Sequence, residues 1–166
     1  VMLSHDNIVS NVIGSRERIP CDENARAVSF LPLCHVYERM VLYLFMYTGV
    51  SVYYAESMET IGDNIREVQP QVFTAVPRLL EKVFDRIMAK GSELTGLKSS
   101  LFFWAVGLAE KWEPYGENGA WYEFQLSIAN KLIFNKWREA LGGKVEVIAS
   151  GSAALQPRLA LSLIHI

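Results

Sequence analysis

Short apolar runs alternate along this chain with segments of helical periodicity, and this alternation limits the folds open to it. The apolar runs cover residues 27–33, 50–54, 71–76 and 144–149, and the helical patterns cover 4–18, 37–47, 60–68, 77–90, 99–112 and 122–140. A strand, a helix and a second strand in succession form a βαβ unit, whose strands run parallel. The sequence therefore predicts an α/β fold with mostly parallel strands and flanking helices.

Three helical patterns follow one another between residues 77 and 141 without an intervening strand. Pro77 can open the first of them, because the first position of a helix has no backbone hydrogen bond to lose. In that helix the apolar side chains share one face and the charged ones the other. A turn is expected over 113–119, which contains one proline and two glycines. The stretch is too long for a simple crossover, so we expect a helical insertion at about 77–141.

Charge and composition exclude several kinds of partner. Sixteen Lys and Arg against eighteen Asp and Glu give a formal net charge of −2 with no basic block, so nucleic acid is not expected. The mean hydropathy of +0.15 raises the question of a membrane span. The best candidate, 40–55, is interrupted by Thr48 and Gly49, and a helix that leads into a buried strand explains it better. Polar residues at 4–7 stand where the apolar core of a signal peptide would begin, so we expect a cytoplasmic location.

His35 is the first candidate for chemistry, because it follows a predicted strand at the edge where α/β sheets bind ligands. The alternative is a structural histidine that caps the next helix, and position alone slightly favours it. Cys34 has no base partner at a motif spacing, so we expect a buried thiol rather than a nucleophile. Cys21 and Cys34 also lack zinc spacing, and no metal site is expected. The pairs Glu38–Arg39 and Glu81–Lys82 are interpreted as solvated or locally paired charges.

A run of small residues, Ser150–Leu155 (SGSAAL), ends the last predicted strand and precedes a helix that opens at Pro157. Small side chains let a ligand approach the backbone closely, but the same residues also form tight turns without a ligand. The run lacks the glycine spacing of a dinucleotide-binding loop and the lysine of a phosphate-binding loop, so alone it is a weak signal. The four tryptophans fall on or near helical apolar stripes, where packing is expected rather than stacking on bases.

The last segment, 161–166 (LSLIHI), breaks the amphipathic pattern that precedes it. It corresponds to the codons CTG TCT CTT ATA CAC ATC, which resemble a transposase adaptor used in sequencing libraries. We therefore expect residues 161–166 to be a non-native tail and residues 1–160 to be the natural chain.

Four blocks occur in a fixed order: 1–7 (VMLSHDN), 31–39 (LPLCHVYER), 76–82 (VPRLLEK) and 150–155 (SGSAAL). Together they resemble the long-chain acyl-CoA synthetases of the adenylate-forming, AMP-binding enzyme superfamily. The second block is similar to the family's LPL-x-H-x-x-E-R block, and the third to the VPR-x-x-E-K segment of its long-chain branch. The resemblance implies that residues 1–160 form an internal part of the family's N-terminal domain. It also implies that the phosphate loop, the magnesium-ligand block and the catalytic lysine lie outside this stretch.

The resemblance implies roles for individual residues as well. Glu38 and Arg39 would begin the helix that flanks the acyl channel. No catalytic residue and no metal ligand would belong to this chain. The implied substrate- and adenylate-binding residues are His35, Tyr37, Gly151, Ser152, Ala153 and Ala154.

The implied activity is ATP-dependent activation of a long-chain fatty acid, with Mg²⁺, to an acyl-adenylate and then to acyl-CoA. It is expected of the whole protein and not of the fragment alone, so the expected partners are fatty acid, ATP and coenzyme A. One alternative is a fatty acyl-AMP ligase or acyl-carrier-protein synthetase, which would need no coenzyme A. An alternative of another class is a non-enzymatic helical module built on 97–141 that associates with a membrane surface or a partner protein. Peripheral association with the inner face of the membrane is compatible with the expected cytoplasmic location.

Overall fold

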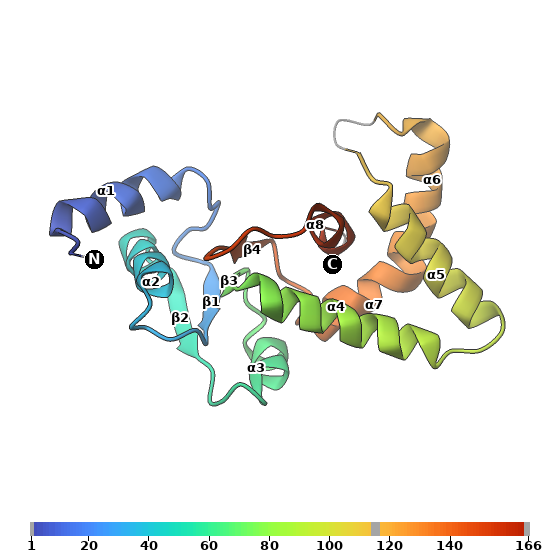
Figure 1. Cartoon of the computed structure of the whole chain (residues 1–166), viewed down its shortest axis with the longest axis horizontal. Coiled ribbons are helices and arrows are strands. Elements are labelled where there is room, and N and C mark those ends of the chain that lie inside the picture. Colours follow the sequence, from blue (N-terminus) through green and yellow to red (C-terminus); the bar gives the residue numbers. More distant parts are fainter. Residues whose placement is uncertain (1, 114–116, 165–166) are drawn as a thin grey trace. The chain divides into compact units, whose positions relative to one another are not determined.

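The structure, a computed structural model, describes residues 2–113 and 117–164 and divides into two compact units. The first unit comprises 1–75 and 139–152, and the second comprises 76–138 and 153–166. Residues 114–116 of the predicted turn and 165–166 of the expected tail lie outside the described residues. The elements in chain order (Figure 1) are α1 (His5–Arg16), β1 (Arg26–Ser29), α2 (Val36–Thr48), β2 (Ser51–Tyr54), α3 (Ile61–Val68), β3 (Val72–Ala75), α4 (Pro77–Ser92), α5 (Leu97–Glu110), α6 (Gly119–Ala129), the π-helical turn η2 (Asn130–Phe134), α7 (Asn135–Ala140), β4 (Val147–Ser150) and α8 (Pro157–Leu163).

The first unit is built on a four-stranded parallel sheet with the strand order β2-β1-β3-β4. This confirms the predicted α/β fold with parallel strands. All four residues of β3 are buried, as expected for a strand paired on both sides. The expectation that 50–54 forms a buried strand is wrong, because β2 is an edge strand. Its Tyr53 and Tyr54 are 45% and 60% exposed.

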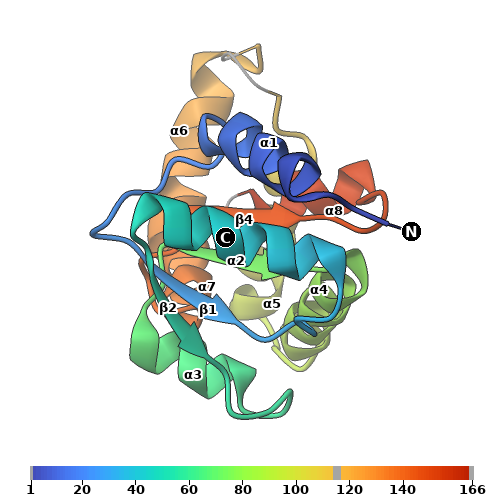
Figure 2. The ribbon, with the colours of Figure 1, turned by 90° about the vertical axis from the view of Figure 1, so that its left-hand side faces the viewer.

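Helices flank this sheet. Helix α2 packs on β1 and β2, and α1 lies over α2 (Figure 2). Helix α3 packs on β1. The connection from β1 to β2 and the connection from β2 to β3 run in opposite directions across the sheet. Since such connections are right-handed in about 98% of cases, α2 and α3 cover opposite faces.

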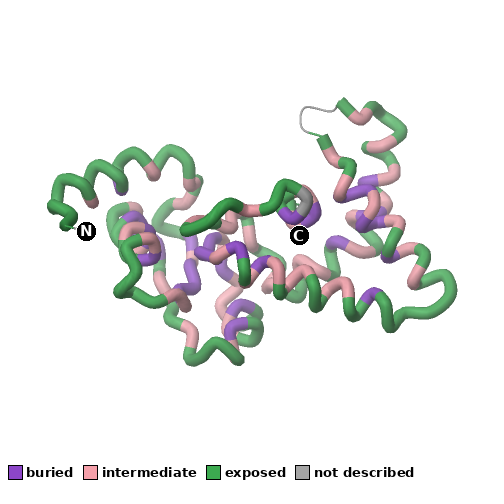
Figure 3. The backbone as a smooth tube through the Cα atoms, in the orientation of Figure 1, coloured by how far each residue is buried: buried purple, intermediate pink, exposed green. Residues whose placement is uncertain are grey.

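Local signals set the ends of these helices. Ser4 and Asn7 form a reciprocal capping box at the start of α1. Helix α2 ends at Gly49, whose φ of 83° only glycine adopts without strain. The apolar core beneath α2, visible as buried segments in Figure 3, contains Ala25, Ala27, Val41, Phe45, Val50 and Val72.

The second unit is helical. Helix α4 has the predicted amphipathic pattern, with Leu80 buried and Lys82, Asp85 and Arg86 exposed. The main core of this unit lies between α5, α6 and η2, and its buried members are Ala105, Leu108, Ala109, Leu126, Ala129 and Phe134. Across the two described ranges no helix is both long and apolar enough to cross a membrane.

The sequence predicted one continuous helix over 122–140, and the structure interrupts it with the π-helical turn η2. Ala129 and Phe134 are both fully buried although five positions separate them, which is the spacing of a π-turn rather than an α-turn. In an α-helix the apolar stripe would continue from Ala129 to Ile133. The extra residue of the π-turn places Phe134 in the core instead. The guanidinium of Arg138 donates hydrogen bonds to the side-chain oxygens of Asn130 and Asn135 across this turn.

The predicted strand over 27–33 is shorter in the structure, because β1 ends at Ser29. A loop then leads to α2, and Cys34 lies in it with its thiol exposed. The expectation of a buried Cys34 is therefore wrong. The prolines and glycines that predicted the ends of elements were more reliable, since α4 and α8 both begin with the expected proline.

Candidate functional site

The loop between β1 and α2 places His35 at the start of a helix. His35 is the N-cap of α2, and its Nδ1 accepts a hydrogen bond from the backbone N–H of Tyr37 at 3.4 Å. The capping role that the sequence offered as the structural alternative is thus present. Because Nδ1 accepts, the neutral ring in this arrangement carries its proton on Nε2. The side chain is exposed, so a cap on one side leaves Nε2 free to serve a ligand on the other.

Tyr37 is the second residue of α2, and its ring packs against the core of the first unit. Its hydroxyl is buried and has no hydrogen-bond partner among the described residues. Burial, together with the nearby charge of Glu38, raises the pKa of the Tyr37 phenol to about 12. A buried hydroxyl without a partner costs about 1–3 kcal/mol relative to a satisfied one. The phenol is therefore protonated at neutral pH and carries an unsatisfied donor inside the first unit.

Gly151 meets the ring of Tyr37 directly after β4. A Cβ atom on residue 151 would lie 2.3 Å from Cε2, 2.7 Å from Cζ and 2.8 Å from Cδ2 of that ring. These distances are too short for any side chain, so glycine is required here for space. The second and fourth sequence blocks, far apart along the chain, therefore meet at one point of the first unit.

The structure corrects the interpretation of Glu38 as a solvated charge. Glu38 is only 2% exposed. Its Oε1 accepts a hydrogen bond from the Ser29 hydroxyl and its Oε2 accepts one from the Thr74 hydroxyl, both at 2.5 Å. Arg39, by contrast, is exposed, and its Nε donates to the carbonyl oxygen of Leu33 at 3.0 Å. Glu38 is therefore bonded in the interior, whereas Arg39 is exposed and bonds to the loop before α2.

Ser29 and Thr74 are hydrogen-bond partners of Glu38 that the sequence prediction missed. Both are buried polar residues, at 3% and 1% exposure. The available signal was a hydroxyl at the carboxyl end of each of two apolar strands. It is weak, because Ser and Thr in such positions are common and their partner is distant in sequence.

The other residues of the glycine/alanine turn are open to solvent. Ser152 is exposed and has a φ of 71°, which is unusual for a residue other than glycine. Such backbone strain is more frequent at ligand sites than elsewhere. Ala153 and Ala154 are exposed and belong to the second compact unit. The structure thus brings together His35, Tyr37 and Gly151 with Ser152 next in the chain, and the two alanines follow in the other unit.

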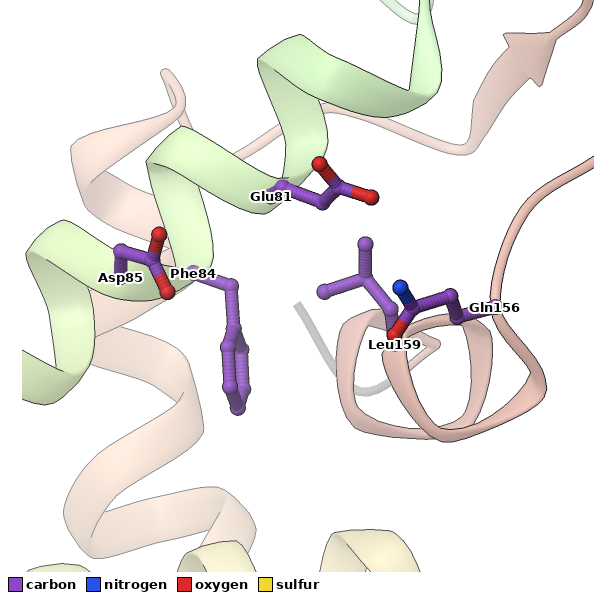
Figure 4. Close-up of a pocket in the computed structure, with 5 residues that line it drawn as sticks. All are labelled: Glu81, Phe84, Asp85, Gln156 and Leu159. Atoms are coloured by element: carbon purple, nitrogen blue, oxygen red, sulfur yellow. The ribbon is translucent and has the colours of Figure 1, made fainter. Parts of the chain in front are cut away.

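A separate pocket of about 300 Å³ lies within the second unit (Figure 4). Glu81, Phe84 and Asp85 of α4 line one side, and Gln156 and Leu159 line the other. The lining thus consists of two carboxylates, one amide and two apolar side chains. It shares none of the residues predicted to bind substrate.

The described residues contain no cluster of three or more metal-ligating side chains. No step through a metal is assigned to this chain.

The sheet and the site define the class of protein. Neighbouring strands β1 and β3 send their connections in opposite directions, and open parallel sheets bind ligands at the carboxyl ends of such strands. The family model described as AMP-binding enzyme matches residues 1–164. The chain belongs to this family.

Similar proteins point to one branch of it. The chain is 32% identical over 161 residues to long chain acyl-CoA synthetase 6, peroxisomal, of Arabidopsis thaliana, covering 96% of this chain and 22% of that protein. It is 32% identical over 158 residues to human long-chain-fatty-acid–CoA ligase 1, covering 92% and 22%. Fatty acyl-CoA synthetase A of Dictyostelium discoideum is 32% identical over 165 residues, covering 96% and 23%. The chain thus spans under a quarter of the length of these relatives.

A solved structure supports the fold independently. The adenylation domain of a carboxylate reductase from Mycobacterium chelonae superposes with a TM-score of 0.58 at 24% identity, covering 95% of this chain and 22% of that one. This confirms the predicted fold class as part of an adenylate-forming domain.

Proposed function

We propose that the protein that carries this chain activates a long-chain fatty acid with ATP and transfers the acyl group to coenzyme A. In the first step a carboxylate oxygen of the fatty acid attacks the α-phosphorus of ATP, the bond to pyrophosphate breaks, and an acyl-adenylate forms. In the second step the sulfur of coenzyme A attacks the acyl carbon, the bond to the phosphate oxygen breaks, and AMP leaves. The thiol loses its proton in this step.

One observation carries the proposal: the contact between Tyr37 and Gly151 at the carboxyl ends of the strands. It joins the two blocks that, by family resemblance, face the acyl group and the adenylate. The names of the similar relatives, all long-chain or fatty acyl-CoA synthetases or ligases, support the same substrate class.

The residues of this chain bind and orient in this reaction. His35 presents Nε2 beside the acyl-adenylate, and the ring of Tyr37 supports Gly151 at the same edge of the sheet. Gly151, Ser152, Ala153 and Ala154 allow the adenine and the acyl carboxyl to approach the backbone. Neither catalytic base nor phosphate clamp is assigned to the described residues.

The test is AMP formation by the purified whole protein with palmitate, ATP, Mg²⁺ and coenzyme A. We expect AMP to form only when both palmitate and coenzyme A are present. An acyl-AMP ligase would instead accumulate palmitoyl-adenylate with no response to coenzyme A, and would turn over on adding a carrier protein. AMP release no higher than in a control without fatty acid would refute the proposal.

The non-enzymatic alternative is tested on the same preparation. If a helical module over 97–141 defined the function, the protein would co-sediment with liposomes while showing no fatty-acid-dependent AMP. The expected cytoplasmic location stays a prediction, and two plant relatives carry the word peroxisomal in their names. Localisation of a tagged whole protein addresses it.

A further inference from the structure

Glu38 is the most deeply buried ionisable side chain of the candidate site. Its carboxylate is 2% exposed, and both oxygens accept hydrogen bonds of 2.5 Å, one from Ser29 and one from Thr74. A buried carboxylate is costly unless its oxygens are satisfied. This one is satisfied by two hydroxyls from two different strands, so it connects three elements of the first unit through one side chain.

The position of these hydroxyls in the sheet is specific. Ser29 is the last residue of β1 and Thr74 is the last but one of β3, so both lie at the carboxyl ends of neighbouring strands. The connection after β1 leads to β2 on one side, and the connection after β3 leads to β4 on the other. This is the point of an open parallel sheet where ligands bind. Glu38 ties the two strands together there.

The location of Glu38 within α2 adds to this effect. It is the third residue of the helix after the cap His35, where the helix dipole favours a negative charge. One turn separates it from His35, and Tyr37 is its direct neighbour. Fixing the carboxylate therefore fixes the rotation and the depth of the first turn of α2. Arg39 holds the preceding loop through the carbonyl of Leu33.

We propose that Glu38 is a positioning residue: its bridge from Ser29 to Thr74 sets where His35 and Tyr37 stand at the acyl-adenylate edge of the sheet. This role differs from lining an acyl channel, because the carboxylate is buried and both of its oxygens are bonded to strand hydroxyls. The inference rests on the proposed function, which identifies His35 and Tyr37 as residues of the acyl-adenylate site. The bridge acts through geometry, so an isosteric amide can replace the carboxylate.

Three variants of the whole protein test the bridge. Glu38→Gln keeps the shape, accepting from one hydroxyl and donating to the other, whereas Glu38→Ala removes both bonds. Glu67→Ala, an exposed glutamate on α3, is the matched control. Amide hydrogen exchange is followed in the peptide that covers 35–40 and in the one that covers 41–48. In Glu38→Ala we expect exchange to be about tenfold faster in 35–40 and little changed in 41–48. In Glu38→Gln and Glu67→Ala we expect little change in either peptide.

Steady-state kinetics then tests whether the bridge from Glu38 to Ser29 and Thr74 positions residues that bind the fatty acid. We expect Glu38→Ala to raise the KM for the fatty acid by about tenfold or more and to leave the KM for ATP unchanged, because displacement by about 1 Å is sufficient to misalign bound groups. Glu38→Gln is expected within about threefold of the parent in both constants. A purely structural role would lower the amount of active protein, so that kcat falls while both KM values stay constant.

The outcomes separate this inference from the proposed function. Unchanged exchange in 35–40 of Glu38→Ala, equal acceleration throughout residues 26–75, or an unchanged fatty acid KM in that variant would overturn the positioning role. If the parent protein forms no acyl-adenylate, the proposed function fails, and the exchange comparison still decides whether Glu38 fixes the start of α2.

Discussion

Replacing Gly151 with alanine tests the contact on which the candidate site depends. The added Cβ would lie 2.3–2.8 Å from three atoms of the Tyr37 ring. Carbon atoms in ordinary contact are about 3.5–4.0 Å apart, so the rigid ring has to move by about 1 Å or more. Overpacking of this kind costs about 1–3 kcal/mol. The φ of Gly151 lies outside the left-handed range, so the cost comes from space and not from backbone strain.

A matched control comes from Gly62 in α3. Nothing lies within 4 Å of a Cβ added there. Gly62→Ala should therefore stabilise the protein by about 0.5–1 kcal/mol, the ordinary gain of alanine over glycine inside a helix. Gly151→Ala is expected to be less stable than this control by about 1.5–4 kcal/mol, the cost of overpacking plus the gain in the control. It should also raise the KM for the fatty acid, because Tyr37 is displaced.

The assay is thermal unfolding of the whole protein together with fatty acid kinetics. Adding Tyr37→Leu to Gly151→Ala removes the ring that the new methyl group meets. The double variant should therefore be more stable than the sum of the single changes by about 0.5–3 kcal/mol, the range measured for side chains in contact. If Gly151→Ala is as stable as Gly62→Ala, with the parent's KM for the fatty acid, the contact between Tyr37 and Gly151 is not as described.

Three other predictions concern single residues. His35→Ala should lower turnover and, by removing the cap of α2, cost about 0.5–2 kcal/mol of stability. Turnover equal to the parent's would leave His35 with a purely capping role. The pKa of the Tyr37 phenol is raised from 10.0 to about 12, so the native state holds this proton more tightly than the unfolded state. The resulting contribution to the free energy of unfolding is fully present below pH 10 and is lost as the pH rises towards 12. Tyr37→Phe should remove that part of the decline in an alkaline unfolding series, and an identical decline would contradict it. In the second unit, Gly91→Ala would place a Cβ 2.1 Å from Cε1 of Phe102, so it should destabilise by about 1–3 kcal/mol in thermal unfolding unless the ring can move away.

The order and type of the elements followed from local signals in the sequence. Proline at the start of α4 and α8 and glycine at the end of α2 act through their own backbone geometry, so they can be interpreted without a partner. The amphipathic pattern of α4 was equally direct. Element lengths were harder to predict, because an apolar run such as 27–33 does not show where pairing in the sheet stops.

The candidate site was only partly predictable, because its key contacts join residues that are distant in sequence. The resemblance of 31–39 and 150–155 to one family identified both blocks, but not the close approach of Tyr37 to Gly151. A glutamate beside an arginine suggests solvent exposure, and the burial of Glu38 depends on hydroxyls contributed by β1 and β3. The π-helical turn could not be predicted either, because one extra residue in a helical turn leaves the apolar pattern of the sequence close to that of an α-helix.

The central claim is that this chain belongs to a protein that activates a fatty acid by transferring AMP to its carboxylate. Exchange of labelled pyrophosphate into ATP by the purified whole protein measures that step alone, before any acyl acceptor is needed. The account predicts exchange that depends on a long-chain fatty acid and is weakened by Gly151→Ala but not by Gly62→Ala. Folded protein that shows no fatty-acid-dependent exchange would contradict it.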